Sequence, residues 1–338
     1  MSVTSRHDLG TVLVTGGAGY IGSHTVRALR ATGRDVVVLD TLELGDRDAV
    51  LGARLVVGDI ADQDLVRTTL GDFGITDVMH FAAYKSVGES MKTPDKYWRN
   101  NVAGTIELLE ACREAEVTRF VFSSSCSVYG TPHHVPVTEE APIAPESVYA
   151  ETKATVERML RWYSTTAGLR AVSLRYFNAA GASFDGRIGE NWDYSINLIP
   201  LAMKAVLLDG HRLQVFASDY DTPDGTCIRD YIHVVDLADA HVKALDYLAA
   251  GNPTIEVNLG TGVGSSVLDV IRAAEDVAGR AVPYDVVDRR PGDPVPTFAD
   301  PSLAHELLGW SAESALYEIV RTASDWHARR VADSNGGP

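Results

Sequence analysis

The sequence has few cysteines, no long apolar run and a deficit of positive charge. Cys112, Cys126 and Cys227 are its only cysteines, and their number and spacing argue against a disulfide framework or a metal site. Thirty Lys and Arg against 46 Asp and Glu give a formal net charge of −16, which argues against a nucleic-acid-binding surface or attraction to anionic membranes. No stretch is long enough to span a membrane, and residues 1–10 lack the apolar core of a signal peptide. We therefore expect a cytoplasmic protein with free thiols.

Strand-like and helix-like stretches alternate over the first half of the sequence. Apolar strands are predicted at 11–15, 35–40, 54–58, 77–81, 119–124 and 170–175, and amphipathic helices at about 20–32, 62–71, 95–116 and 149–167. This alternation predicts an α/β fold with a doubly wound, Rossmann-like parallel sheet, whose ligands lie beyond the carboxyl ends of the strands. Past residue 178 the pattern loosens into glycine-rich and polar segments, with helices at about 234–250 and 265–279.

The segment Gly16-Gly-Ala-Gly-Tyr-Ile-Gly22 lies between the first strand and the first helix. Its glycines fit the dinucleotide-binding spacing at 17, 19 and 22, and a wider-spaced variant at 16, 19 and 22. Free N–H groups at the helix start favour phosphates. Asp40 ends the next strand, where a carboxylate accepts from ribose hydroxyls and repels a 2′-phosphate. Glycine-rich turns are common, but this combination predicts a nucleotide cofactor and favours NAD over NADP.

Tyr149 and Lys153 lie four residues apart at the start of a predicted helix, so their side chains share one face. A cation about 4 Å from a phenol contributes roughly 4 kcal/mol at an effective dielectric constant near 20, or about three pKa units. The positive nicotinamide ring adds to this effect. We therefore expect Tyr149 to serve as a phenolate base near pH 7. Taken alone, the pair is equally a surface tyrosine beside a solvated lysine.

A run of serines, Ser123-Ser-Ser125, ends the strand predicted at 119–124, at the edge of the sheet where ligands bind. A hydroxyl there can hydrogen-bond a substrate oxygen and pass a proton between it and a phenolate. Ser123 and Ser124 can equally cap the turn. Ser125 is therefore the candidate catalytic serine.

With these motifs in place, the chain resembles the UDP-glucose 4-epimerases (UDP-galactose 4-epimerases) of the extended short-chain dehydrogenase/reductase superfamily. The resemblance runs from residue 11 to about 326. The glycine segment and Tyr149-x-x-x-Lys153 indicate only the superfamily. Closer to the epimerases are the segments 80–90, 174–178, 224–233, 258–264 and 289–293. The resemblance implies an NAD-binding domain at 1–177 and a smaller, mixed UDP-sugar-binding lobe at 178–338, with about 228–250 packing back on the first domain.

The resemblance also implies roles for individual residues. Those expected around NAD are Gly16, Gly19, Tyr20, Ile21, Gly22, Asp40, Asp59, Ile60, Phe81, Ala82, Ala83, Lys85, Asn100, Ser125, Tyr149, Lys153 and Phe177. Those expected around the UDP-hexose are Lys85, Ser125, Tyr149, Asn178, Asn197, Leu198, Phe216, Arg229, Arg290, Asp293 and Thr297. Arg229 and Arg290 offer fork-shaped donors suited to a diphosphate, although either one alone can be a surface salt-bridging arginine.

The implied reaction is epimerisation at C4. Tyr149 takes the proton of the 4-hydroxyl while NAD⁺ takes the C4 hydride, the 4-keto sugar turns, and the hydride returns to its opposite face. A 4,6-dehydratase would carry an Asp-Glu pair where Cys126 and Ser127 stand, and a related decarboxylase a glutamate at Ser127. A net sugar-nucleotide reductase and a UDP-hexosamine or UDP-pentose epimerase stay open. A non-catalytic NAD sensor is disfavoured because Ser125, Tyr149 and Lys153 are all present.

Two further expectations come from the resemblance. Thr297 stands where some epimerases carry a bulky tyrosine, which predicts room for an N-acetyl group and a side activity on UDP-GlcNAc and UDP-GalNAc. A homodimer is expected through the helices at about 95–116 and 149–167. The apolar residues of these helices could equally belong to the core; they include Leu108, Leu109, Met159, Leu160 and Trp162.

Overall fold

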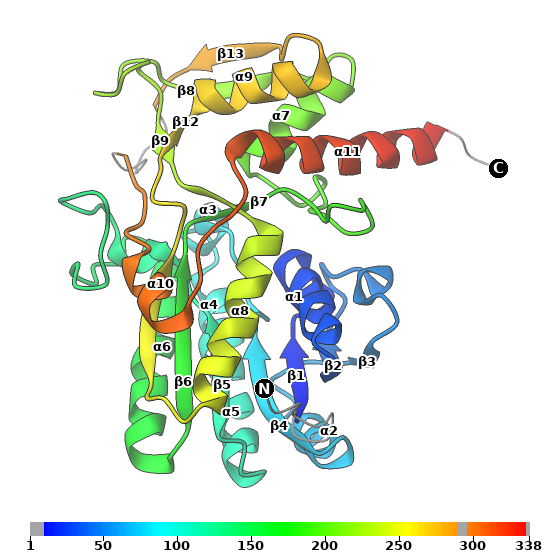
Figure 1. Ribbon diagram of the computed structural model, residues 1–338, viewed down its shortest axis with the longest axis vertical. Coiled ribbons are helices and arrows are strands. Elements are labelled where there is room, and N and C mark those ends of the chain that lie inside the picture. The colour runs from blue at the N-terminus through cyan, green and yellow to red at the C-terminus, as the bar shows by residue number, and fades with distance from the viewer. Residues whose placement is uncertain (1–9, 290–295, 336–338) are drawn as a thin grey trace.

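A seven-stranded parallel sheet forms the centre of the computed structural model, which describes residues 10–289 and 296–335 (Figure 1). Its strands are β1 (Thr11–Thr15), β2 (Asp35–Asp40), β3 (Arg54–Val57), β4 (Ile75–His80), β5 (Arg119–Ser123), β6 (Arg170–Tyr176) and β11 (Ile255–Leu259). They are ordered β11-β6-β5-β4-β1-β2-β3, and every neighbouring pair is parallel. The chain changes direction across the sheet between β1 and β4, which makes the carboxyl ends of these strands the switch point for ligands. The predicted doubly wound fold is confirmed.

Helices cover both faces of the sheet, and two apolar cores follow from this (Figure 1). One face is covered by α1 (Tyr20–Ala31) and α8 (Val234–Ala249), and the other by α2 (Gln63–Asp72), α5 (Gly104–Glu114) and α6 (Val148–Ala167). Successive strand residues point to opposite faces, so Val12 and Val14 belong to the first core and Leu13 to the second. This is why the strands appear in the sequence as unbroken apolar runs.

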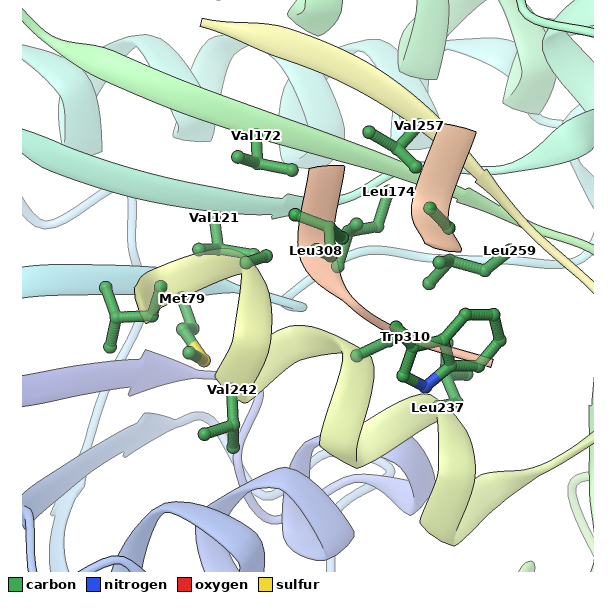
Figure 2. Packing of buried hydrophobic residues seen from close by; sticks show 14 of the residues in the cluster. Met79, Val121, Val172, Leu174, Leu237, Val242, Val257, Leu259, Leu308 and Trp310 are labelled. Atoms are coloured by element: carbon green, nitrogen blue, oxygen red, sulfur yellow. The ribbon is translucent and has the colours of Figure 1, made fainter. Parts of the chain in front are cut away.

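The first core is closed by a late segment of the chain. Figure 2 shows Leu237 and Val242 of α8, together with Leu308 and Trp310, lying over apolar residues of β5, β6 and β11. The Trp310 side chain is 1% exposed, and its indole N–H donates to the Asp236 carbonyl at 2.9 Å. A residue more than 300 positions along the chain therefore completes the core of the sheet.

A smaller lobe stands over the carboxyl ends of the strands (Figure 1). Its paired strands are β7 (Asn178–Ala180) with β10 (Tyr231–His233), β8 (Leu213–Phe216) with β13 (Tyr284–Val287), and β9 (Ile228–Arg229) with β12 (Ser265–Ser266). Its helices are α7 (Leu198–Leu207), α9 (Val267–Ala278) and α11 (Leu316–Asn335), while α10 (Ser302–Leu308) packs on α8. Within residues 10–289 and 296–335, no helix combines the length and the apolar character of a membrane span.

The structure contains elements that the sequence did not predict, and it divides one predicted helix. Strand β11, which pairs with β6 at one edge of the sheet, was not predicted, nor were helices α7, α10 and α11 or the short strands of the smaller lobe. The helix predicted at 95–116 is divided into α4 (Pro94–Tyr97), a π-helical segment (Trp98–Ala103) and α5. The remaining short helices are α3 (Val87–Ser90) and the 3₁₀ turns Arg47–Val50 and Cys126–Tyr129. The division of the chain at residue 177 stays a prediction.

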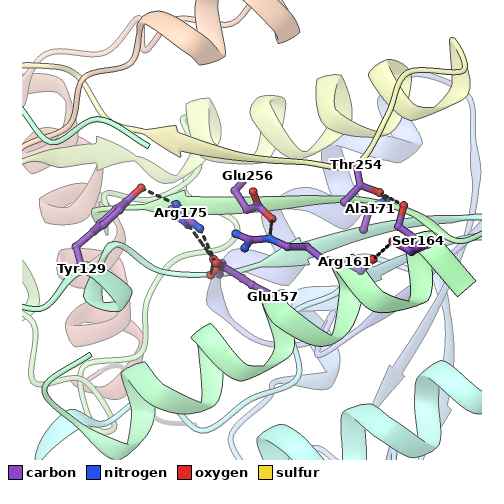
Figure 3. A network of polar contacts seen from close by, with 10 residues as sticks. Tyr129, Glu157, Arg161, Ser164, Ala171, Arg175, Thr254 and Glu256 are labelled. Atoms are coloured by element: carbon purple, nitrogen blue, oxygen red, sulfur yellow. Dashed lines mark hydrogen bonds and ion pairs between the residues drawn. The ribbon is translucent and has the colours of Figure 1, made fainter. Parts of the chain in front are cut away.

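A buried ion pair joins helix α6 to strand β6 (Figure 3). The side chains of Glu157 and Arg175 are each 2% exposed, and Arg175 Nη2 donates to Glu157 Oε2 at 2.7 Å. Arg175 Nη1 donates to the Tyr129 hydroxyl at 2.9 Å, which donates in turn to Asn258 Oδ1 at 2.7 Å. The Ser124 hydroxyl donates to Glu157 Oε1 at 2.5 Å. The pair therefore fixes helix α6 against the serine turn that follows β5.

Replacing Glu157 by glutamine should lower the free energy of unfolding by about 3–5 kcal/mol, because Arg175 is left buried without its counter-charge. Urea unfolding of purified protein measures the change. Glu256→Gln is the control, since Glu256 pairs with Arg161, whose side chain is 51% exposed, and such pairs contribute about 0–1 kcal/mol. Equal losses of unfolding free energy in the two variants would contradict the conclusion that the buried Glu157–Arg175 pair stabilises the protein more than the exposed pair does.

Candidate active site

A cavity of about 770 Å³ lies at the carboxyl ends of β1, β2 and β4. This volume is in the range of cofactor and ligand sites. The expected residues that line it are Gly16, Gly19, Tyr20, Ile21, Gly22, Asp40, Asp59, Ile60, Phe81, Ala82, Ala83, Lys85, Asn100, Tyr149 and Lys153. The fold therefore gathers, from six separate stretches of the chain, most of the residues expected around NAD.

The glycine segment forms a cradle that tolerates no side chain. Gly16 has φ +71, and a Cβ there would lie 2.6 Å from the Ala82 backbone nitrogen. A Cβ on Gly22 would lie 2.2 Å from the Gly16 carbonyl oxygen. Gly17 instead packs against Val38 and is not among the cavity-lining residues. The wider-spaced reading of the motif, with glycines at 16, 19 and 22, is therefore the one that faces the cavity.

Helix α1 presents its amino end to this cavity. Its N-cap is Gly19, no side chain caps its first N–H groups, and its first turn carries no acidic residue. Uncapped N–H groups and the positive end of the helix dipole favour a phosphate at this place. The Asp40 carboxylate, fixed by the N–H groups of Ala18 and Leu42 at 2.9 Å each, stands at the end of β2 for a ribose. The residues present fit a dinucleotide with an unmodified ribose.

The remaining cofactor candidates lie around the same cavity. Asp59 accepts from the Ala61 N–H at 2.9 Å, and the Phe81 ring packs on His241 with centroids 4.7 Å apart. Asn100 lies in the π-helical segment, a distortion often found at functional sites. Phe177 is outside the cavity lining; it is 6% exposed and donates its N–H to the Leu259 carbonyl.

Tyr149 and Lys153 lie on helix α6 beside the serine turn. The Lys153 ammonium donates to the Ser123 carbonyl at 2.8 Å and lies 5.9 Å from the centroid of the Tyr149 ring. The Ser125 side chain lies near enough to the Tyr149 phenol to lower its pKa, and it accepts from the Ser127 N–H at 3.2 Å. Ser125 does not itself line the cavity. The structure thus brings Ser125, Tyr149 and Lys153 together, as the sequence motifs predict.

The electrostatics of these groups differ from the expectation. Burial is the largest effect on the Tyr149 phenol and raises its pKa well above the usual value, while the hydrogen bond with Ser125 lowers it. Burial also lowers the pKa of Lys153 to about 7, opposed by the negative charge of Glu157. The prediction that Lys153 and the nicotinamide ring together make Tyr149 a phenolate near pH 7 stays a prediction. Burial, which the spacing of the two residues does not reveal, opposes it because desolvation disfavours both charged forms.

Most of the residues expected around the UDP-sugar belong to the smaller lobe, outside the cavity lining. Asn178 begins β7, Leu198 begins α7 and Phe216 ends β8. Arg229 lies in β9 and forms a parallel β-bridge with Thr297, which is 8% exposed. Arg290 and Asp293 lie outside the described residues. Among the described residues expected around the UDP-sugar, only Lys85 and Tyr149 line the cavity.

The sequence analysis missed several residues of the site. Those that also line the cavity include Arg187, Glu190, Tyr194, Trp326 and Arg330. Asn197, an expected residue, donates from Nδ2 to Glu190 Oε1 at 2.8 Å. Glu190 and Arg187 lie in a glycine-rich segment without periodicity, so no local pattern marks them.

The sequence analysis also missed Arg175, which lies outside the cavity but supports the serine turn. Its position inside the apolar run 170–176 was a usable signal, because a charge there must find a buried partner.

The comparisons with known proteins agree with this geometry. Residues 12–260 match the profile of the NAD dependent epimerase/dehydratase family. A UDP-glucose 4-epimerase of Rhizobium leguminosarum bv. trifolii is 46% identical over 319 residues, covering 94% of this chain and 98% of that protein. A structure titled UDP-glucose 4-epimerase from Brucella ovis in complex with NAD has a TM-score of 0.92 and 46% identity, covering 94% of this chain and 98% of its own. One from Bifidobacterium longum, in complex with NAD⁺ and UDP, has a TM-score of 0.89 and 38% identity, covering 97% and 100%.

Replacing Gly22 by alanine should abolish retention of NAD and lower the free energy of unfolding by about 1–3 kcal/mol, because the new Cβ meets backbone that cannot yield. The measurements are the NAD released from heat-denatured protein and urea unfolding. Gly71→Ala is the control: Gly71 is also helical, and nothing lies within 4 Å of a Cβ there. A Gly22→Ala protein with its full NAD content would refute the claim that NAD binding requires a glycine at this position.

Proposed function

This chain belongs to the NAD dependent epimerase/dehydratase family, and we propose that it interconverts UDP-glucose and UDP-galactose by inverting C4 of the sugar. The observation that carries the proposal is the placement of Ser125, Tyr149 and Lys153 beside a cavity built for a dinucleotide. The likeness to named UDP-glucose 4-epimerases over nearly the whole chain supports the same substrate.

NAD is the cofactor, and when bound it supplies a hydride acceptor for C4 and returns the hydride to the opposite face. Asp40 accepts from the ribose hydroxyls, and the first N–H groups of α1 bind the pyrophosphate. Because the reaction has no net oxidation or reduction, the protein retains NAD between turnovers. Family members that act as net reductases must release the reduced cofactor instead.

Proton transfer is the task of the chain's own side chains. Tyr149 takes the proton of the sugar 4-hydroxyl and later returns it, and the nearby Ser125 side chain lowers the pKa of its phenol. Burial favours the neutral phenol, so the phenolate depends on positive charge nearby. The ammonium of Lys153 supplies part of that charge, and the nicotinamide ring of bound NAD⁺ supplies the rest. The base is therefore active only when the cofactor is in place.

The uridine diphosphate is the part of the substrate that the protein holds. We assign Arg229 and Arg290 to the diphosphate, and Asn178, Asn197, Leu198 and Phe216 to the rest of the UDP site. Asp293 and Thr297 are assigned to the sugar. Such an arrangement leaves the hexose free to turn, so either face of C4 reaches the cofactor. Binding energy from the nucleotide thus serves a reaction at a sugar that is itself loosely held.

Tyr149→Phe should lower kcat for UDP-galactose by about 10²–10⁴-fold while NAD content stays unchanged, because only proton transfer is lost. NMR analysis of UDP-hexoses and UDP-pentoses incubated anaerobically, without added NAD, gives the products and the rates. Tyr247→Phe, on helix α8, is the matched control. Normal inversion by Tyr149→Phe, or net release of NADH by the unmodified enzyme, would overturn the proposal.

Lys153→Met should move the acid limb of the kcat–pH profile to higher pH by at least about one unit. The sign follows from charge: the ammonium stabilises the phenolate, so removing it raises the pKa of Tyr149 and leaves less base at pH 7. The profile is measured between pH 5 and 9 on protein with confirmed NAD content. An unchanged acid limb would show that Lys153 does not act on the phenol.

We propose also that the enzyme accepts UDP-GlcNAc and UDP-GalNAc, because Thr297 is small and its backbone is bridged to Arg229. Thr297→Tyr should lower kcat/KM for UDP-GalNAc by about 10-fold or more and change that for UDP-galactose little, since added side-chain volume excludes the N-acetyl group. Thr297→Gly is the opposite control. Lack of N-acetyl turnover in both the unmodified enzyme and Thr297→Gly would refute the volume argument.

The active form is, in this proposal, a cytoplasmic homodimer that pairs helices α5 and α6 with those of a second copy. Trp162 on α6 is 69% exposed and Ile106 on α5 is 40% exposed, so these apolar side chains are available to a second copy. Leu108, Leu109 and Leu160 are instead buried in the core of the chain, and Met159 packs against that core. Only the outward residues of these helices are therefore available to a partner.

A further inference from the structure

Glu190 is a buried carboxylate between the cofactor cavity and the start of helix α7. The residue is 5% exposed and lines the cavity. Its Oε1 accepts two hydrogen bonds, from Lys85 Nζ at 3.1 Å and from Asn197 Nδ2 at 2.8 Å. A buried carboxylate is stable only when it is paired in this way. One oxygen atom therefore joins a residue that follows β4 to the N-cap of α7.

The backbone around Glu190 is held in place from the opposite side. The Glu190 carbonyl accepts from the indole N–H of Trp326 on helix α11 at 3.0 Å. A Cβ on Gly189 would lie 2.6 Å from the Trp326 ring, so chain and ring are in close contact. The segment that carries Glu190 is therefore packed firmly, and the carboxylate has a fixed position from which to orient its partners.

The negative charge of Glu190 also acts on Tyr20, the first residue of helix α1. Burial is the largest cause that raises the pKa of Tyr20, and the charge of Glu190 is the second largest. The Tyr20 hydroxyl donates to the Gly181 carbonyl at 2.7 Å, which fixes the ring near this charge. Glu190 thus acts on three residues expected to touch cofactor or substrate: Tyr20, Lys85 and Asn197.

We propose that Glu190 is a positioning residue that couples the cofactor site to the UDP site. It holds the ammonium of Lys85 at the cavity wall and the amide of Asn197 at the start of α7 in one arrangement. The Lys85 side chain is 60% exposed and has three N–H donors, of which Glu190 takes one, so two remain to bind a ligand. The inference rests on the proposed function, because that function assigns Lys85 and Asn197 to the two ligands.

The test is a double-mutant cycle on UDP binding by the purified, NAD-containing protein. Isothermal titration with UDP should show about tenfold weaker binding for Glu190→Gln and for Asn197→Ala, as expected when a charge-assisted hydrogen bond is lost. The double variant should bind UDP no more than about twofold more weakly than either single variant, because both changes break the same link. In steady state, Glu190→Gln should raise KM for UDP-galactose and leave kcat nearly unchanged.

Glu275→Gln is the matched control. Glu275 Oε1 accepts from the Val282 N–H at 3.0 Å within the smaller lobe, so this variant should bind UDP normally. Multiplicative losses in the double variant, or normal UDP binding by Glu190→Gln, would overturn the coupling. If Glu190→Gln loses NAD, a second double-mutant cycle on UDP binding replaces the first, with Lys85→Met and Asn197→Ala as its single variants. Independent effects of these two changes on UDP binding would refute the link through Glu190.

The two proposals fail in different ways. UDP binding does not require turnover, so the cycle can be measured whether or not the protein epimerises sugars. Unmodified protein that binds UDP without interconverting UDP-hexoses would refute the proposed function alone. Unmodified protein that interconverts them, with additive effects in the cycle, would refute the role of Glu190 alone.

Discussion

The ion pair of Glu157 and Arg175 is the constraint on which the arrangement of the catalytic groups depends. It lies under the serine turn and joins helix α6 to strand β6, with Ser124 and Tyr129 bonded to it (Figure 3). Tyr149 and Lys153 stand on the same helix, and Ser125 follows Ser124. A hydrophobic pair could hold the helix as tightly. It could not supply the negative charge that raises the pKa of Lys153 against the effect of burial.

That charge matters because Tyr149 and Lys153 are both buried, and burial pushes each toward its neutral form. A neutral phenol is a poor base and a neutral amine stabilises no phenolate. The protein therefore does not complete the base by itself. In the proposed mechanism, the positive charge of bound NAD⁺ would shift this balance, so the base would form only where the cofactor is present. Proton abstraction would then be tied to oxidation of the sugar.

The sequence predicts the sheet well because strands buried on both faces are apolar throughout, as in β1, β2 and β5, and because the glycine segment and Asp40 are local signals. Strand β11 escaped prediction because Glu256 and Asn258 interrupt its apolar residues. Both polar side chains are satisfied by partners far along the chain, Arg161 and Tyr129. Glu190 escaped for the same reason, since its significance depends on Lys85 and Asn197. The raised pKa of Tyr149 depends on burial, which spacing along a helix does not reveal.

The two buried carboxylates, Glu157 and Glu190, support different parts of the site. Glu157 fixes the groups that move protons, all of which stand on α6 or at the end of β5, within the rigid sheet. Glu190 instead links the cavity to α7, an element of the smaller lobe. A sugar that must present both faces of C4 cannot be gripped by rigid groups. It can be tethered through its nucleotide by the smaller lobe, where Glu190 orients Lys85 and Asn197, while the base and the cofactor stay fixed. Inversion requires that only the substrate turns.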